Sequence, residues 1–144
     1  MTTAELTVLG WSFLLLMAYG AIHVGGLELI RRFKPSQEDH RYLGLLATFW
    51  GLAILHLVEI AVGALVLALV LMAEGAGSLS EGFGSTAADF FYLAGTSFAT
   101  LGYTQLDATG PIRLLIMVLS LSGFMLITWS ATFIYTIWGE SFRE

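Results

Sequence analysis

Two ionisable side chains lie three positions apart inside a long apolar stretch. His56 and Glu59 both fall within the apolar run 42–73, and residues three apart share one face of a helix. A carboxyl group in apolar surroundings has to be protonated or paired with a partner. If this run crosses a membrane, both side chains are candidates for function, because ionisable residues inside a span are costly to keep there.

Three interpretations of this pair are open. The first is a structural hydrogen bond between helices. The second is a pH sensor, because histidine titrates near physiological pH. The third is a metal or proton-transfer site completed by His23 of the preceding apolar run. Helix rise alone places His23 and His56 roughly 10 Å apart in depth, and we therefore expect the third interpretation to be the weakest.

The composition is that of an integral membrane protein. Of the 144 residues, 57% are hydrophobic and only 12% are charged, whereas soluble domains contain about 25% charged residues. A spanning helix needs about 20 apolar residues, and three runs are long enough, at 6–30, 42–73 and 112–138. The chain has no cysteine, which excludes disulfides and thiolate metal sites.

The charges between these runs predict the orientation in the membrane. Four basic residues lie between the first and second runs: Arg31, Arg32, Lys34 and Arg41. Loops that face the cytoplasm carry an excess of Lys and Arg. The segment after the second run has acidic residues and no basic ones as far as Asp89. We therefore predict an N-terminus outside, a cytoplasmic C-terminus, and, for so compact a chain, a prokaryotic inner (plasma) membrane.

A shorter segment lies between the second and third runs. Residues 89–98 have an amphipathic pattern, and Ser85 or Thr86 is a candidate N-cap with Asp89 in the first turn. A helix of about a dozen residues spans roughly 20 Å, less than the roughly 30 Å hydrocarbon core. Length alone does not decide between a re-entrant segment and an interfacial helix. The loop at 75–85, rich in Gly and Ser, is predicted to be a flexible surface loop.

The residues that follow the short helix carry a resemblance to a known family. They are Thr100, Leu101, Gly102, Tyr103 and Thr104. In this setting, residues 89–138 resemble the pore helix, selectivity filter and inner helix of potassium channels of the two-transmembrane type, whose filter reads Thr-Val-Gly-Tyr-Gly. The resemblance covers about a third of the chain.

The resemblance implies an all-α membrane protein with three transmembrane helices plus a re-entrant pore helix and a filter loop. The pore domain would occupy 43–144, after an N-terminal helix and cytoplasmic loop over 1–42. Its parts would be an outer helix at 43–73, a pore helix at 86–99, a filter at 100–104 and an inner helix at 112–138. Four copies would surround one pore, because stacked rings of backbone carbonyls replace the water around a cation.

Two further residues acquire expected roles from the resemblance. Gly123 falls where the family often has a hinge in the inner helix, and close helix packing through a small residue is the alternative. Asp107 lies near the expected pore mouth, where a negative charge would raise the local concentration of cations.

Two positions depart from the family pattern. Thr104 stands where the family has its second glycine, and a β-branched residue resists positive φ. Gln105 replaces an acidic residue. We therefore expect potassium to permeate and leave sodium permeation open. The alternatives are a non-selective cation channel, a membrane protein that handles protons or metal through His56 and Glu59, and a scaffold that does not conduct.

The expected partners follow from these predictions. They are membrane lipid, other copies of the same chain in a homotetramer, and monovalent cations. We expect no catalytic activity, no cofactor and no nucleic acid.

Overall fold

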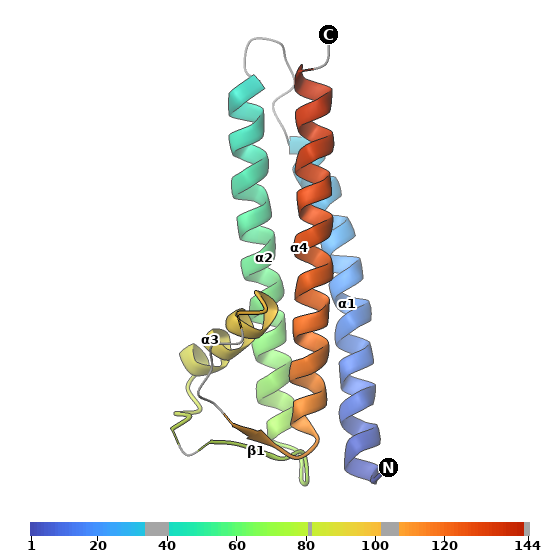
Figure 1. Cartoon of the computed structure of the whole chain (residues 1–144), viewed down its shortest axis with the longest axis vertical. Helices are drawn as coiled ribbons and strands as arrows, with labels where there is room; N and C mark the ends of the chain where they lie inside the picture. The colour runs from blue at the N-terminus through green and yellow to red at the C-terminus, as the bar shows by residue number, and fades with distance from the viewer. Residues whose placement is uncertain (34–40, 81, 102–106, 143–144) are drawn as a thin grey trace.

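The computed structural model describes residues 1–33, 41–80, 82–101 and 107–142. In chain order these form α1 (Thr3–Phe33), α2 (Arg41–Leu71), β1 (Ser78–Leu79), α3 (Ala87–Phe98), β2 (Ala108–Thr109) and α4 (Ile112–Phe142). The helices α1, α2 and α4 run side by side along the long axis, and the short α3 lies obliquely against α2 and α4 (Figure 1).

The three long helices are each long and apolar enough to cross a membrane, which confirms the three predicted spans. Each contains 31 residues and is therefore about 46 Å long, more than the roughly 30 Å hydrocarbon core. The first helix extends beyond the predicted run 6–30 at both ends. Glu5 in its first turn and Arg31 and Arg32 in its last turn suit the helix dipole and let the helix continue past its apolar part.

The start of α3 is fixed by a capping box. Thr86 is the N-cap: its hydroxyl oxygen accepts a hydrogen bond from the backbone N–H of Asp89, and the Asp89 carboxylate accepts one from the backbone N–H of Thr86. Two backbone donors at the helix end are thus satisfied by side chains. The structure therefore selects Thr86 over Ser85 as the cap.

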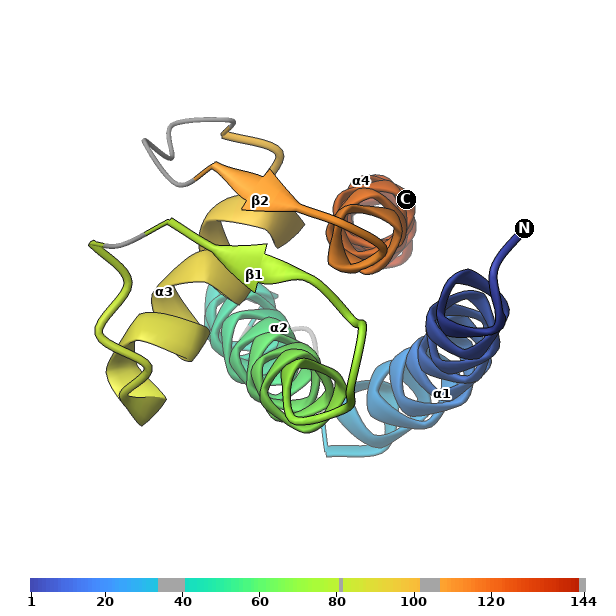
Figure 2. The ribbon, with the colours of Figure 1, turned by 90° about the horizontal axis from the view of Figure 1, so that it is seen from below.

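The segments before and after α3 lie at the same end of the bundle. Strands β1 and β2 pair antiparallel, with Ser78 opposite Thr109 and Leu79 opposite Ala108. Figure 2 shows the pair beside the end of the bundle where α2 ends and α4 begins. Part of the predicted loop at 75–85 is thus a strand, which was missed because two residues are too short to show a periodic pattern.

Two glycines make this strand pairing possible. Gly77 and Gly110 have φ angles of +112° and +79°, which side chains other than hydrogen rarely tolerate. A Cβ atom on Gly110 would lie 2.8 Å from the Cα of Gly77. The two backbones can therefore approach each other only because both positions lack a side chain.

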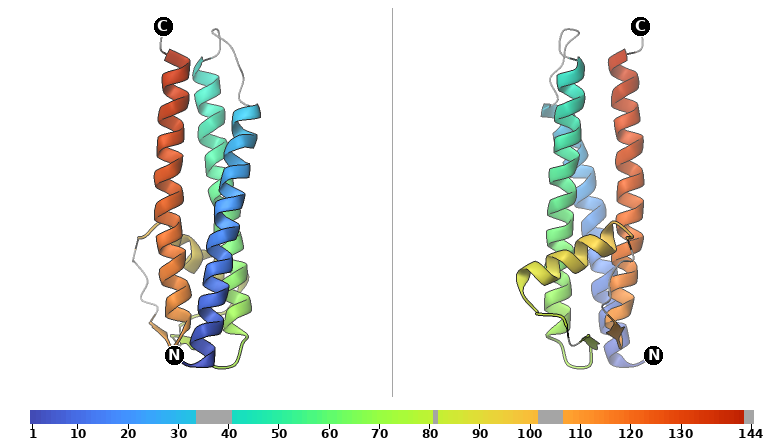
Figure 3. Two further views of the ribbon diagram at one scale, coloured as in Figure 1. Left: turned by 90° about the vertical axis from the view of Figure 1, so that its right-hand side faces the viewer. Right: turned by 60° about the vertical axis from the view of Figure 1, so that its left-hand side comes forward.

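The apolar core joins all four helices. It contains buried side chains of α1, α2, α3 and α4, among them Tyr19, Leu67, Phe98 and Leu119. Figure 3 shows that α3 meets the bundle at mid-height, away from both ends of the long helices. The end of α3 is therefore held at an interior level of the bundle.

Candidate functional site

The carboxylate of Glu59 lies at the centre of a buried polar cluster. One oxygen, Oε1, is 2.9 Å from His23 Nδ1, and the other, Oε2, is 2.8 Å from His56 Nδ1. The side chains of Glu59 and His23 are completely buried, and that of His56 is 20% exposed. One carboxylate thus joins two imidazoles, from α1 and from α2.

The sequence-based expectation for His23 was wrong. The rings of His23 and His56 are stacked, with centroids 5.8 Å apart, so the two rings differ in depth by 5.8 Å at most and not by roughly 10 Å. Helix rise measures position along one helix only, and α1 and α2 are shifted relative to each other in a way that the rise of each helix does not fix. His23, His56 and Glu59 therefore lie close enough together to form one site.

A third helix supports this cluster through residues that were not predicted. Ser130 of α4 is buried, and its Oγ is 3.0 Å from His56 Nε2. The ring of Trp129 lies 5.3 Å from that of His23. One feature of the sequence could have indicated Ser130. It follows Gly123 by about two helical turns, so the two residues lie on the same face of α4.

Phe98, the last residue of α3, connects the cluster to the predicted filter segment. Its buried ring is 5.6 Å from that of His56 and 6.0 Å from that of Tyr19. Its backbone packs directly on Gly123, where an added Cβ would clash with the Phe98 carbonyl group and lie 2.7 Å from its Cα. Gly123 is therefore a point of close backbone contact, and its role as a hinge stays a prediction.

The structure describes the first two residues of the predicted filter, Thr100 and Leu101, which come shortly after Phe98 in the chain. Thr100 is exposed and has φ of +55°, a strained angle for a β-branched residue. Its N–H and that of Leu101 donate to the carbonyls of Ser97 and Thr96, at 2.9 and 3.0 Å. Leu101 is 68% exposed. Gly102, Tyr103 and Thr104 lie outside the described residues, and Asp107 is exposed beyond them.

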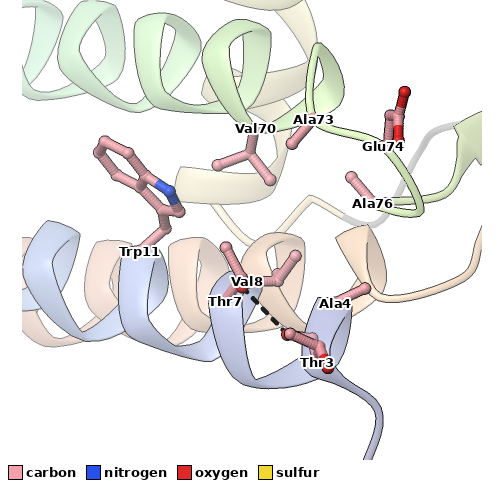
Figure 4. A pocket seen from close by; sticks show the side chains of 9 residues that line it. All are labelled: Thr3, Ala4, Thr7, Val8, Trp11, Val70, Ala73, Glu74 and Ala76. Atoms are coloured by element: carbon pink, nitrogen blue, oxygen red, sulfur yellow. Dashed lines mark hydrogen bonds between the residues drawn. The ribbon is translucent and has the colours of Figure 1, made fainter.

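A separate cavity of about 290 Å³ lies between the start of α1 and the end of α2 (Figure 4). The lining residues are Thr3, Ala4, Thr7, Val8, Trp11, Val70, Ala73, Glu74 and Ala76. None of them belongs to the cluster of His23, His56 and Glu59. The cavity is therefore distinct from the cluster around Glu59.

Comparison with known families decides the broad class of the protein. A family described as "Ion channel", of the two-transmembrane type, matches residues 55–138, which is more than half of the chain. The chain belongs to this ion channel family. No curated protein and no solved structure matches the chain significantly. Together with three membrane-spanning helices, membership identifies an integral membrane protein of the ion channel class.

The family match also divides the polar cluster. The matched region begins within α2, includes α3 and ends within α4. Helix α1 lies before it and is therefore an additional N-terminal helix. His56, Glu59 and Ser130 lie inside the matched region of this ion channel, whereas His23 lies outside it. The additional helix therefore contributes one of the two imidazoles that bind Glu59. The predicted pH sensor at His56 and Glu59 stays a prediction.

Proposed function

We propose that four copies of this ion channel chain surround one pore and conduct potassium through the backbone carbonyls of residues 100–104. The observation that carries the proposal is the position of the α3 end. Phe98 is fixed against Gly123, which lies about 16 Å along α4 at 1.5 Å per residue. The segment 100–104 starts at that level.

The paired strands support a re-entrant path for this segment. Since β1 and β2 adjoin at one end of the bundle, the chain between them enters and leaves on one side. Backbone without helix is tolerated at membrane depth where it is buried in protein or lines an aqueous cavity. A pore formed by several subunits provides such a cavity. On the charge pattern, we place this side outside the cell, with the C-terminus in the cytoplasm of a prokaryotic cell.

The direction of α3 suits a cation. Its C-terminal end points into the bundle (Figure 1), and the C-terminal end of a helix carries a partial negative charge. Asp107 is exposed and adds negative charge where the chain returns. Both features raise the local concentration of cations.

Exposed side chains on and after α3 support assembly. Tyr92 is 56% exposed and Leu101 is 68% exposed in the single chain. One filter segment cannot encircle an ion, and four copies would bring these side chains toward neighbouring subunits. Native mass spectrometry of the purified complex should give four times the chain mass, and a monomer or dimer as the conducting species would contradict the proposal.

Ion flux in proteoliposomes tests conduction and selectivity. With a potassium gradient and then a sodium gradient, we expect potassium flux well above sodium flux and block by barium. Equal fluxes would support the non-selective alternative, which is motivated by Thr104 and Gln105. Flux of neither ion, in any condition that opens the channel, would contradict the proposal.

A matched pair of variants locates the ion path. Thr100→Ala should strongly lower potassium flux or change the selectivity, because it removes a hydroxyl at the start of the proposed filter. Thr132→Ala makes the same chemical change at an exposed site of α4, where the hydroxyl donates to the Thr128 carbonyl of the same helix, and should leave flux unchanged. Equal behaviour of the two variants would contradict a filter at 100–104.

A further inference from the structure

The cluster around Glu59 brings three potential metal ligands together from two helices. His23, His56 and Glu59 each offer a ligand atom, and these atoms lie within 4.8 Å of one another. We propose that the three residues bind one divalent transition-metal ion of the Zn²⁺ type. The site would bind α1 to α2 next to the end of α3.

The donor set has the right chemistry. Two imidazole nitrogens and one carboxylate oxygen are a set that zinc uses in proteins, with bonds of about 2.0–2.2 Å. Two ligands on one such ion lie about 3.0–3.4 Å apart, as bond lengths and angles near 90–109° require. The observed N···O distances are 2.9 and 2.8 Å, each to a different oxygen of Glu59, and the three ligand atoms lie within 4.8 Å of one another. Movements of roughly 1.5 Å or less would therefore bring them to the spacing that one ion requires.

The surroundings of the cluster fit a metal site. A histidine that ligates metal through one ring nitrogen nearly always uses the other in a hydrogen bond that orients the ring. His56 meets this requirement through Ser130 Oγ, 3.0 Å from Nε2. Trp129 packs against the ring of His23. The site would thus include orienting contacts from α4 as well as ligands from α1 and α2.

The buried charge of Glu59 also favours a bound cation. Glu59 is completely buried, and a carboxylate in the membrane interior needs a positive partner. Among the residues that the structure describes, Tyr19 Oη and His23 Nε2 are buried polar atoms without a hydrogen-bond partner. Tyr19 and His23 are one turn apart on α1, and Gly63 leaves the space that the Tyr19 hydroxyl occupies. His23 Nε2 is the ring nitrogen that does not contact Glu59, so the described residues give His56 an orienting hydrogen bond and give His23 only the packing of Trp129.

Direct metal binding tests the proposal independently of ion conduction. The full chain, purified in detergent without a histidine tag and stripped with EDTA, would be titrated with Zn²⁺ and, for its absorption spectrum, with Co²⁺. We expect one ion per chain. The chain has no cysteine, so thiolate bands cannot obscure the Co²⁺ spectrum. Absence of stoichiometric binding by the wild-type chain overturns the proposal, whatever the channel conducts.

Variants assign the ligands. His23→Gln and Glu59→Gln should each weaken binding at least about 100-fold, and Ser130→Ala about 10- to 100-fold. The chain contains three histidines, and the third, His40, provides the control: His40→Gln should bind like the wild type. Binding that survives in His23→Gln or Glu59→Gln, or that is lost in His40→Gln, overturns the proposal.

A measurement on the wild-type chain tests the ligands even if the variants fail to fold. X-ray absorption of the wild-type zinc adduct should show two imidazoles and at least one oxygen at about 2.0–2.2 Å. Fewer than two imidazoles around the ion overturns the proposal.

Discussion

The backbone of Phe98 lies where a side chain on Gly123 would stand. The ideal Cβ position at Gly123 is 2.6 Å from the carbonyl carbon of Phe98 and 2.7 Å from its Cα. These atoms are backbone, so no rotamer change can relieve the contact. The end of α3 and the middle of α4 are thereby fixed against each other, at the level of the cluster around Glu59.

Gly123→Ala should therefore destabilise the fold by about 1–3 kcal/mol, the usual cost of overpacking. The measurement is reversible unfolding in mixed detergent micelles. Gly20→Ala is the matched control, because nothing lies within 4 Å of a Cβ there and alanine favours a helix by up to about 1 kcal/mol. A Gly123→Ala protein of wild-type stability but altered opening would favour the hinge interpretation.

Removal of the shared carboxylate should destabilise the metal-free chain strongly. Glu59→Ala leaves two imidazoles without their common partner, and breaking a buried pair typically costs about 3–5 kcal/mol. Glu28→Ala, at an exposed glutamate of α1, should cost much less. A double-mutant cycle of His23→Ala with Glu59→Ala, measured in EDTA, should give a coupling energy of about 0.5–3 kcal/mol. Additive effects would show that the two residues are not coupled.

The cap of α3 should depend on pH in a defined direction. Hydrogen bonds from the Thr86 side chain and backbone hold the pKa of Asp89 below its ordinary value of 3.8. A carboxyl group with a lowered folded-state pKa stabilises the fold above its ordinary pKa and loses that effect as pH falls through the lowered value. The loss is therefore expected below about pH 4.

NMR titration of the Asp89 carboxyl group checks this prediction. Thr86→Ala removes the side-chain hydrogen bond that contributes most to the shift, so it should raise the Asp89 pKa toward 3.8. The same variant should destabilise the chain by about 1 kcal/mol through loss of the cap. An Asp89 pKa that does not respond to Thr86→Ala would contradict the capping-box explanation.

The ion pair between Arg31 and Glu140 should matter little. It joins the ends of α1 and α4 with an N···O distance of 3.0 Å, but the side chains are 58% and 41% exposed. Exposed pairs contribute about 0–1 kcal/mol and are screened by salt. Arg31→Gln should thus change unfolding stability by less than about 1 kcal/mol, and by nothing measurable in 1 M salt. A larger effect that persists in salt would show that the pair is shielded from solvent.

Local patterns in the sequence predicted the elements and their local chemistry. Apolar runs predicted three spanning helices, because a membrane requires about 20 apolar residues for each. Thr86 and Asp89 predicted the start of α3, since a cap depends on residues three apart. The pairing of His56 with Glu59 followed from spacing on one helix. Each of these relationships lies within a few positions of the chain.

Tertiary structure decided the contacts between elements. His23 binds Glu59, and Phe98 meets Gly123, because of the shift and rotation of one helix relative to another. The packing of side chains along the whole interface sets these quantities, and the periodicity of a single helix carries no measure of them. For the same reason the expected difference in depth between His23 and His56 was wrong, and the site that joins three helices became visible only in the folded chain.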